Sequence, residues 1–345
     1  MGPRGAPKRG SLDAAPNDVR KRKAGGQLDQ TVRARAVFGA VLAFAMASTD
    51  GKRVDANAGG SADQLVHAWQ LIDGRHWQIA SPASEEPDVT DALEKTRGRC
   101  TEGMVEVEGR MMVEGAGYFD AVDALQRNVC VDWINRTFPE RCARFDGEHW
   151  RAVSADIPRK AAHFCIDRFE HPNRRGAYPW VLVSWDEARG ICASQSKRLC
   201  TEAEWTFACE GEEALPYPYG YERDGDACVV DRPWRQVHAE ALQPRNTARA
   251  KAELDRLWQG EPSGARPRCR SPFGVYDMTG NVDEWTTSVV PGERPSILKG
   301  GYWGPVRTRC RPSTRAHGQT FAFYQQGLRC CSDPPNAPAT PRSNP

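Results

Sequence analysis

The spacing of apolar and polar residues along the chain predicts short strands and helices. Apolar and acidic residues alternate in 100–109, as in a strand with one buried face, and 164–170 predicts a second strand. Apolar residues recur at helical spacing across 119–136. We also expect one short helix near 62–71. The pattern therefore predicts short elements of both types.

Two further helix starts are indicated by capping boxes. Ser184 is followed three residues later by Glu187, and Thr201 is followed by Glu204. In such pairs the hydroxyl and the carboxylate accept hydrogen bonds from backbone amides of the first turn that have no helical partner. We therefore predict helices at both positions, with Glu204 as a structural cap and Trp205 packed in the core.

Residues 1–47 combine a basic region with a short apolar run that ends in small residues. This order is typical of a secretory signal peptide, and the run is shorter than the about 20 residues that span a membrane. A retained N-terminal membrane anchor, or a basic tail before a buried helix, are the alternatives. We expect an exported protein in the periplasm, the cell envelope or the medium.

The remaining chain divides into three parts. We interpret the polar, mixed residues 48–95 as a linker or variable region and 96–331 as the folded domain. The Pro-rich residues 332–345 predict a disordered tail.

Net charge and cysteines narrow the class of protein. A net charge of +2 gives no reason to expect a nucleic-acid partner. The twelve cysteines are dispersed and form no Cys-x-x-Cys pair. An even number of dispersed cysteines behind a signal-like segment indicates disulfides formed in an oxidising compartment. Composition does not determine which cysteines pair.

The segment 273–286 carries the clearest candidate chemistry. It places two glycines, an asparagine, Asp277 and Glu284 beside aromatic residues. Glycines allow sharp backbone turns, and carboxylate and carbonyl oxygens suit Ca²⁺. A Gly-Asn turn between two strands is the alternative interpretation.

Further motifs occur in a fixed order around this segment: 183–188, 197–205, 216–220, 280–285, 299–303 and 327–330. Together they resemble the formylglycine-generating enzyme (sulfatase-modifying factor) family, over roughly residues 100–331. The resemblance implies an irregular α+β fold related to C-type lectins, rich in loops and stapled by disulfides. It also implies that Cys192 pairs with Cys330, and Cys209 with Cys310. The other eight cysteines stay unassigned.

The oxidases of this family use two further cysteines, which bind copper(I) and act on the substrate thiol. They precede the position that Cys310 matches, and the interval 301–310 contains no earlier cysteine. We therefore predict no thiol oxidation and no copper site, unless a shifted alignment gives Cys310 or Cys331 a new role. No two histidines are four residues apart, so we predict no iron site and assign no catalytic residue.

The resemblance implies one calcium ion held by Asp277, the carbonyls of Gly280 and Val282, and Glu284. A second calcium site of the family uses an asparagine, and a valine within 228–231 stands in its place here. We therefore expect one site.

The resemblance also indicates a ligand groove. Asp283 stands where the family usually carries a tryptophan near the substrate, which favours a different, basic ligand. Trp303, Arg307, Arg309 and Arg315 could line the groove, although arginines also suit an ordinary charged surface. We expect a module that binds an exported protein, a peptide or a glycan. The alternative is a divergent copper- or iron-dependent oxidoreductase that modifies an exported protein or a small molecule.

Overall fold

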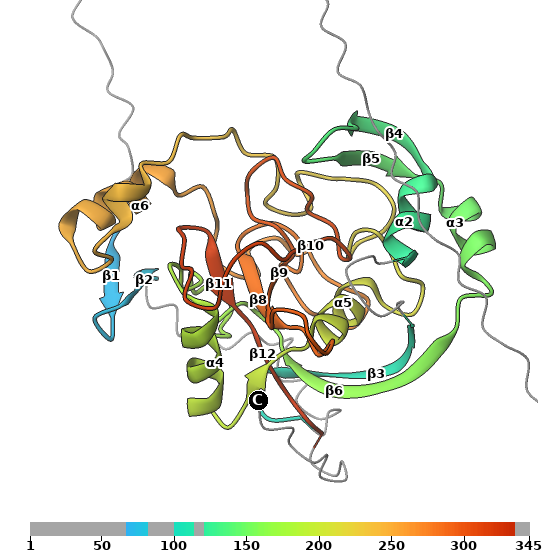
Figure 1. Ribbon diagram of the computed structural model, residues 1–345, viewed down its shortest axis with the longest axis horizontal. Helices are drawn as coiled ribbons and strands as arrows, with labels where there is room; N and C mark the ends of the chain where they lie inside the picture. Colours follow the sequence, from blue (N-terminus) through green and yellow to red (C-terminus); the bar gives the residue numbers. More distant parts are fainter. Residues whose placement is uncertain (1–66, 82–99, 114–120, 335–345) are drawn as a thin grey trace, which may run out of the picture. The chain divides into compact units, whose positions relative to one another are not determined.

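The computed structural model describes residues 67–81, 100–113 and 121–334 (Figure 1). The predicted export segment and the part of the predicted tail after residue 334 lie outside these ranges. No helix in the described part of the chain is long and apolar enough to cross a membrane.

One sheet has the strand order β3-β6-β12-β7. β3 (Met104–Met112) and β6 (Arg159–Asp167) are the long antiparallel pair at the lower edge of Figure 1. β12 (Cys330–Ser332) pairs with both β6 and β7 (Arg198–Leu199). Both predicted strands are confirmed with shifted bounds, since β3 begins after residue 100 and β6 ends before residue 170.

The second sheet has the order β10-β9-β8-β11. Its strands are β8 (Asp283–Thr287), β9 (Ser296–Lys299), β10 (Ser313–Thr314) and β11 (Gln326–Leu328). β8 runs antiparallel to β9 and parallel to β11. Asp283 and the buried Glu284 are adjacent on β8, so their side chains point to opposite faces of the sheet.

The two helices with capping boxes are confirmed. α4 (Trp185–Ser194) and α5 (Glu202–Glu210) both show the reciprocal side-chain and backbone hydrogen bonds of the box. Glu204 accepts from the Thr201 amide at 2.8 Å. Trp205 is fully buried in the core cluster that α5 shares with β3 and β6.

The single helix predicted over 119–136 is wrong beyond residue 128. α2 (Ala121–Asn128) is followed by the hairpin of β4 (Cys130–Asn135) and β5 (Arg141–Phe145), and then by α3 (Gly147–Ser154). A disulfide joins Cys130 to Cys142 across the hairpin. Strand pairing and this bond determine the backbone here, although the apolar spacing suits a helix.

The helix predicted near 62–71 is also wrong where the structure describes it. β1 (Trp69–Ile72) and β2 (His76–Ile79) form an antiparallel hairpin, and residues 62–66 lie outside the described ranges. Trp69 donates to Asp255 at 3.1 Å and packs on Trp258. The hairpin thus belongs to the folded unit, although it lies within the predicted linker. It packs near the 3-10 helix η1 (Ala239–Leu242) and α6 (Ala248–Leu257).

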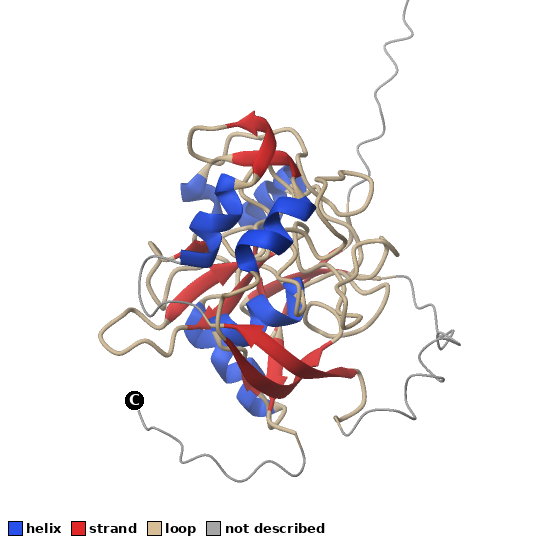
Figure 2. Cartoon of the chain, turned by 90° about the vertical axis from the view of Figure 1, so that its right-hand side faces the viewer, coloured by secondary structure: helices blue, strands red, loops and turns tan. Residues whose placement is uncertain are grey.

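Loops occupy much of the chain between these elements, as the tan segments of Figure 2 show. Six disulfides connect them: Cys100–Cys165, Cys130–Cys142, Cys192–Cys330, Cys200–Cys331, Cys209–Cys310 and Cys228–Cys269. The irregular, disulfide-stapled α+β architecture that the sequence predicted is confirmed.

Candidate functional site

The loop before β8 turns at positions where φ is positive, at Asp277 (57°), Gly280 (81°) and Asn281 (55°). A Cβ atom on Gly280 would lie 2.3 Å from the carbonyl oxygen of Val229. The Asn281 amide donates to that same carbonyl at 3.0 Å. Only glycine allows the backbone to approach this closely, so Gly280 is required by the path of the loop.

Glu284 leaves this loop on β8 with its carboxylate fully buried. Arg329 donates to one of its oxygens from Nη2 at 2.7 Å and to the other from Nε at 2.9 Å. Trp205 donates from Nε1 at 2.7 Å. Both oxygens of this predicted calcium ligand are therefore engaged by side chains, in a buried pair whose loss would be costly.

Glu170, three residues after the end of β6, is a site residue that the sequence reasoning missed. Its buried carboxylate accepts from Ser263 Oγ and from Asn281 Nδ2, both at 2.7 Å, and from the Val282 amide at 3.3 Å. Asn281 in turn accepts from the Glu261 amide at 2.9 Å. The only signal in the sequence is an acidic residue at the end of an apolar strand.

Three buried carboxylates share one arginine in this cluster. Burial raises the pKa of Glu170 well above its ordinary value, and repulsion from Asp277 and Glu284 raises it further, while Arg329 acts in the opposite sense. Burial also raises the pKa of Asp277 to about 7, although the Gly264 amide donates to this carboxylate at 2.7 Å. With all three carboxylates ionised the cluster would carry more negative than positive charge in a region that excludes water, so without a cation the raised pKa values favour protonated carboxyl groups.

This surplus of carboxyl groups over cations is the observation against which the fit of a calcium ion is tested. A divalent cation would balance it, and carboxylate and carbonyl oxygens are the ligands that Ca²⁺ takes. Asp277 and Glu284 would supply charge, and Gly280 and Val282 would supply carbonyls, with Glu284 shared with Arg329. In donor chemistry these residues suit a calcium ion, and both oxygens of Glu284 already accept hydrogen bonds from Arg329 and Trp205.

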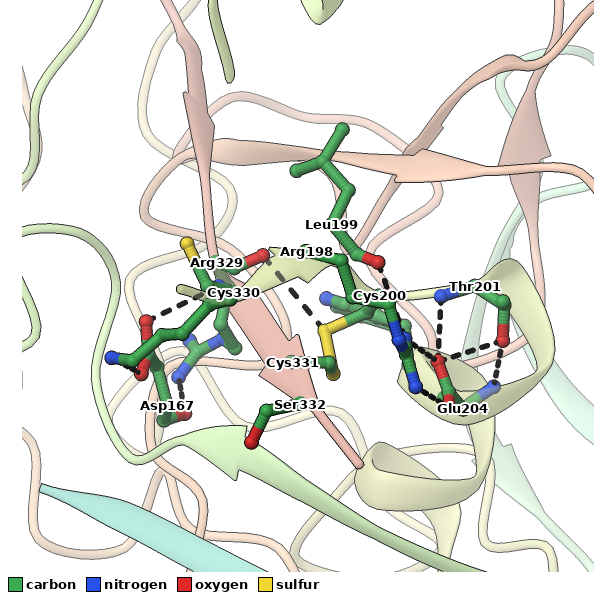
Figure 3. Close-up of a disulfide and its surroundings, with 12 residues drawn as sticks. Asp167, Arg198, Leu199, Cys200, Thr201, Glu204, Arg329, Cys330, Cys331 and Ser332 are labelled. Carbon is green, nitrogen blue, oxygen red and sulfur yellow. Dashed lines mark hydrogen bonds and ion pairs between the residues drawn. A yellow bond between two sulfur atoms is a disulfide. The ribbon is translucent and has the colours of Figure 1, made fainter. Parts of the chain in front are cut away.

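No thiol is left at the position of the family's catalytic pair. All twelve cysteines of the sequence are bonded, and both pairings implied by the resemblance are present. Cys310 is fully buried and bonded to Cys209. Cys331, the other cysteine considered for a new role, is bonded to Cys200 beside the Arg198–Glu204 ion pair (Figure 3).

A pocket of about 200 Å³ lies where β8, β9 and the loop after β9 meet. Asp283, Tyr302, Arg307 and His317 line it, together with Phe138 from the tip of the β4–β5 hairpin. Burial raises the pKa of Asp283 to about 7, and the charge of the neighbouring Glu284 adds to this effect. The pocket thus combines one acid, two basic side chains (Lys299 and Arg307), an imidazole and the aromatic rings of Phe138 and Tyr302.

The other predicted groove residues do not line this pocket. Trp303 is 1% exposed and packs against Trp258 and Tyr324 in the core. Arg309 is buried, where it donates to Gln126 at 2.6 Å and pairs with Asp123. Arg315 pairs with Glu202 and Glu293. The structure therefore places these three side chains outside this pocket, because internal packing and ion pairs hold them elsewhere.

Comparison with known proteins identifies the family. Residues 110–334 match the sulfatase-modifying factor enzyme 1-like domain, and the chain belongs to this family. It is 32% identical over 180 residues to an inactive C-alpha-formylglycine-generating enzyme 2 of Bos taurus, covering 45% of this chain and 50% of the relative.

It is 30% identical over 188 residues to a formylglycine-generating enzyme of Mycobacterium tuberculosis, covering 46% and 59% of the two chains. The chain thus spans about half the length of these relatives. The solved structure of PvdO from Pseudomonas aeruginosa aligns with a TM-score of 0.39 at 15% identity, covering 68% of this chain and 97% of that one.

Proposed function

We propose that this protein is an exported binding domain that uses the sulfatase-modifying-factor scaffold without thiol oxidation. The observation that carries the proposal is the disulfide between Cys209 and Cys310, with all other cysteines paired as well. Oxidation of a substrate thiol in this family needs thiolates, since the thiolate is the nucleophile and metal ligand. Six disulfides also favour an oxidising compartment.

The binding site of this proposal is the Asp283 pocket. Its volume of about 200 Å³ is smaller than the about 300–1,000 Å³ of sites for drug-sized ligands. It therefore suits one side chain or one sugar of a longer peptide, protein or glycan. Arg307 supplies a positive charge, and Asp283, with its pKa raised to about 7, supplies a carboxyl group that is partly ionised at neutral pH. Arg307 lies over the exposed ring of Phe138 at 5.1 Å. The ring and the guanidinium provide a flat surface for stacking.

One calcium ion in the loop before β8 completes the proposal. The excess of buried carboxylates supports it, since a bound cation would neutralise Glu170 and Asp277, which burial otherwise penalises. Its role would be structural, because it would hold together a loop that is hydrogen-bonded to residues 168–170, Val229, residues 261–264 and residues 300–303.

The first test counts thiols in the full-length protein, denatured without reductant, and measures its copper and iron content. We expect no reactive thiol and no stoichiometric copper or iron. Two reactive thiols, or copper-dependent oxidation of a cysteine-containing peptide, would refute the proposal. Stoichiometric iron with turnover would favour a metal-dependent oxidoreductase.

The second test locates the ligand. A displayed peptide library and a glycan array are screened with the wild type, with Arg307→Gln and with the control Asp156→Asn, whose side chain is exposed. We expect Arg307→Gln to lose the ligands that the wild type and the control retain. Retention of the same ligands by all three proteins would exclude the pocket as the binding site.

A further inference from the structure

The hairpin of β4 and β5 has an edge with which no other strand of the described chain pairs. The two strands form a sheet of their own, and Figure 1 shows β4 on the outer side of β5. The other side of β5 is occupied, since the Phe145 amide donates to the Tyr221 carbonyl at 3.0 Å. Within the described ranges no strand occupies the corresponding side of β4. An edge strand of this kind is a template for pairing with a further strand.

β4 also exposes two large apolar side chains. Val131 is 50% exposed and Ile134 is 48% exposed. Both lie at bulges that the pairing with β5 skips, and a bulge re-aims the side chain it carries. With Phe138 at the tip, the hairpin holds three of the nine large apolar side chains that the described residues expose. Exposed apolar groups that gather on one element point to an interaction surface.

The hairpin is ordered before any partner binds. The disulfide between Cys130 and Cys142 joins its two strands. At the tip, Asn135 Oδ1 accepts from the Thr137 amide at 3.2 Å and from the Thr137 hydroxyl at 3.0 Å. A surface that is already ordered loses little conformational entropy on binding.

The charges on either side of Ile134 indicate which strand pairs here. Asp132 precedes Ile134 by two residues and Arg136 follows it by two, and both are exposed. The Arg136 guanidinium lies 5.8 Å from the ring centre of Trp133, and neither charge forms an ion pair with another described residue. In an antiparallel second copy of β4 the charges run in the opposite order. When Ile134 lies opposite its own copy, Asp132 lies opposite Arg136 at both ends of the contact.

We propose that this protein forms a symmetric dimer in which the β4 strands of two copies lie antiparallel, edge to edge, with Ile134 at the two-fold axis. The two-stranded sheets of the two copies then join into one. A two-fold contact uses the same surface on both copies, so each favourable pair occurs twice. The dimer does not depend on the proposed ligand binding. Because Phe138 of the same hairpin lines the Asp283 pocket, the dimer would carry two such pockets.

Sedimentation velocity of the full-length protein over a dilution series tests the dimer. We expect a concentration-dependent dimer in the wild type and in the control Asp156→Arg, which reverses an exposed charge outside the hairpin. Asp132→Arg places like charges opposite each other twice. We expect it to raise the dissociation constant by at least about 2- to 30-fold, the range for two lost cross-strand pairs. The exchange Asp132→Arg/Arg136→Asp restores both pairs and is expected to restore the dimer.

Three results would overturn the proposal. A wild type that stays monomeric at every concentration would leave the edge to a strand of another protein. An exchange variant that dimerises no better than Asp132→Arg would show that these charges do not face each other. A control that loses the dimer as Asp132→Arg does would mean that only overall charge matters. Thermal unfolding of each variant checks that the fold is kept, as expected for exposed side chains.

A cysteine at the two-fold axis tests the register. Facing residues of antiparallel strands have Cα atoms about 4.5 or 5.5 Å apart, which suits a disulfide. We therefore expect Ile134→Cys to form a covalent dimer under mild oxidation. The control Val153→Cys, at a residue of α3 that is 38% exposed, is expected to stay without this bond. Equal cross-linking of the two variants would contradict the proposed contact.

Discussion

Replacement of Asp277 by Asn measures how much free energy of unfolding is lost by burying the Asp277 charge in the carboxylate cluster. Asparagine has nearly the same shape and also tolerates the positive φ of 57° at this position. Its side-chain oxygen can still accept the hydrogen bond from the Gly264 amide, which is 2.7 Å long in the wild type. The substitution therefore removes the charge and leaves the path of the loop intact.

The effect depends on pH because the pKa of Asp277 differs between the folded and unfolded states. It is about 7 in the folded protein, against an ordinary value of 3.8. Between these values the unfolded chain loses the proton and the folded chain keeps it, so the wild type loses stability as the pH rises through this window. A shift of this size corresponds to roughly 4 kcal/mol above pH 7.

Urea unfolding in the presence of a chelator, measured from pH 4 to pH 8, provides the assay. We expect Asp277→Asn and the wild type to be about equally stable near pH 4, and the variant to be more stable by up to roughly 4 kcal/mol near pH 8. Added calcium is expected to stabilise the wild type at pH 8 and the variant less, because the cation would neutralise the same charge. The exposed control Asp156→Asn is expected to follow the wild type throughout.

Two results would refute this reasoning. A difference between Asp277→Asn and the wild type that does not change with pH would mean that the carboxylate is not held protonated by burial. A variant that is less stable than the wild type at pH 8 without calcium would mean that its charge is already balanced within the cluster.

Two further variants test the backbone and the buried ion pair. Arg329→Met leaves Glu284 buried without its partner, and we expect the free energy of unfolding in urea to fall by about 3–5 kcal/mol. A fall of less than about 1 kcal/mol would contradict the pairing. Gly280→Ala forces a methyl group against the Val229 carbonyl at positive φ, and we expect the free energy of unfolding to fall by at least about 1–3 kcal/mol. Gly190→Ala, on the exposed side of α4, is the matched control and is expected to gain about 0.5–1 kcal/mol. Similar effects of the two glycine substitutions would contradict the close approach.

Features that depend on neighbouring residues were predictable from the sequence. The capping boxes at Ser184 and Thr201 act over three residues, so their partners are visible in the sequence itself. The order of the motifs identified the family, and with it the pairings of Cys192 and Cys209. The missing thiol before Cys310 could likewise be read directly from the sequence.

Features that depend on distant segments were decided only by the tertiary structure. Glu170 meets Asn281 across 111 residues, and Trp303 and Arg309 are buried by segments that the motif pattern does not specify. The apolar spacing of 119–136 suits a helix, but residues 130–135 pair as a strand because a disulfide and a neighbouring strand are available to them. Burial, pKa and charge balance are properties of the space around a side chain, and that space is filled by residues far away in the sequence.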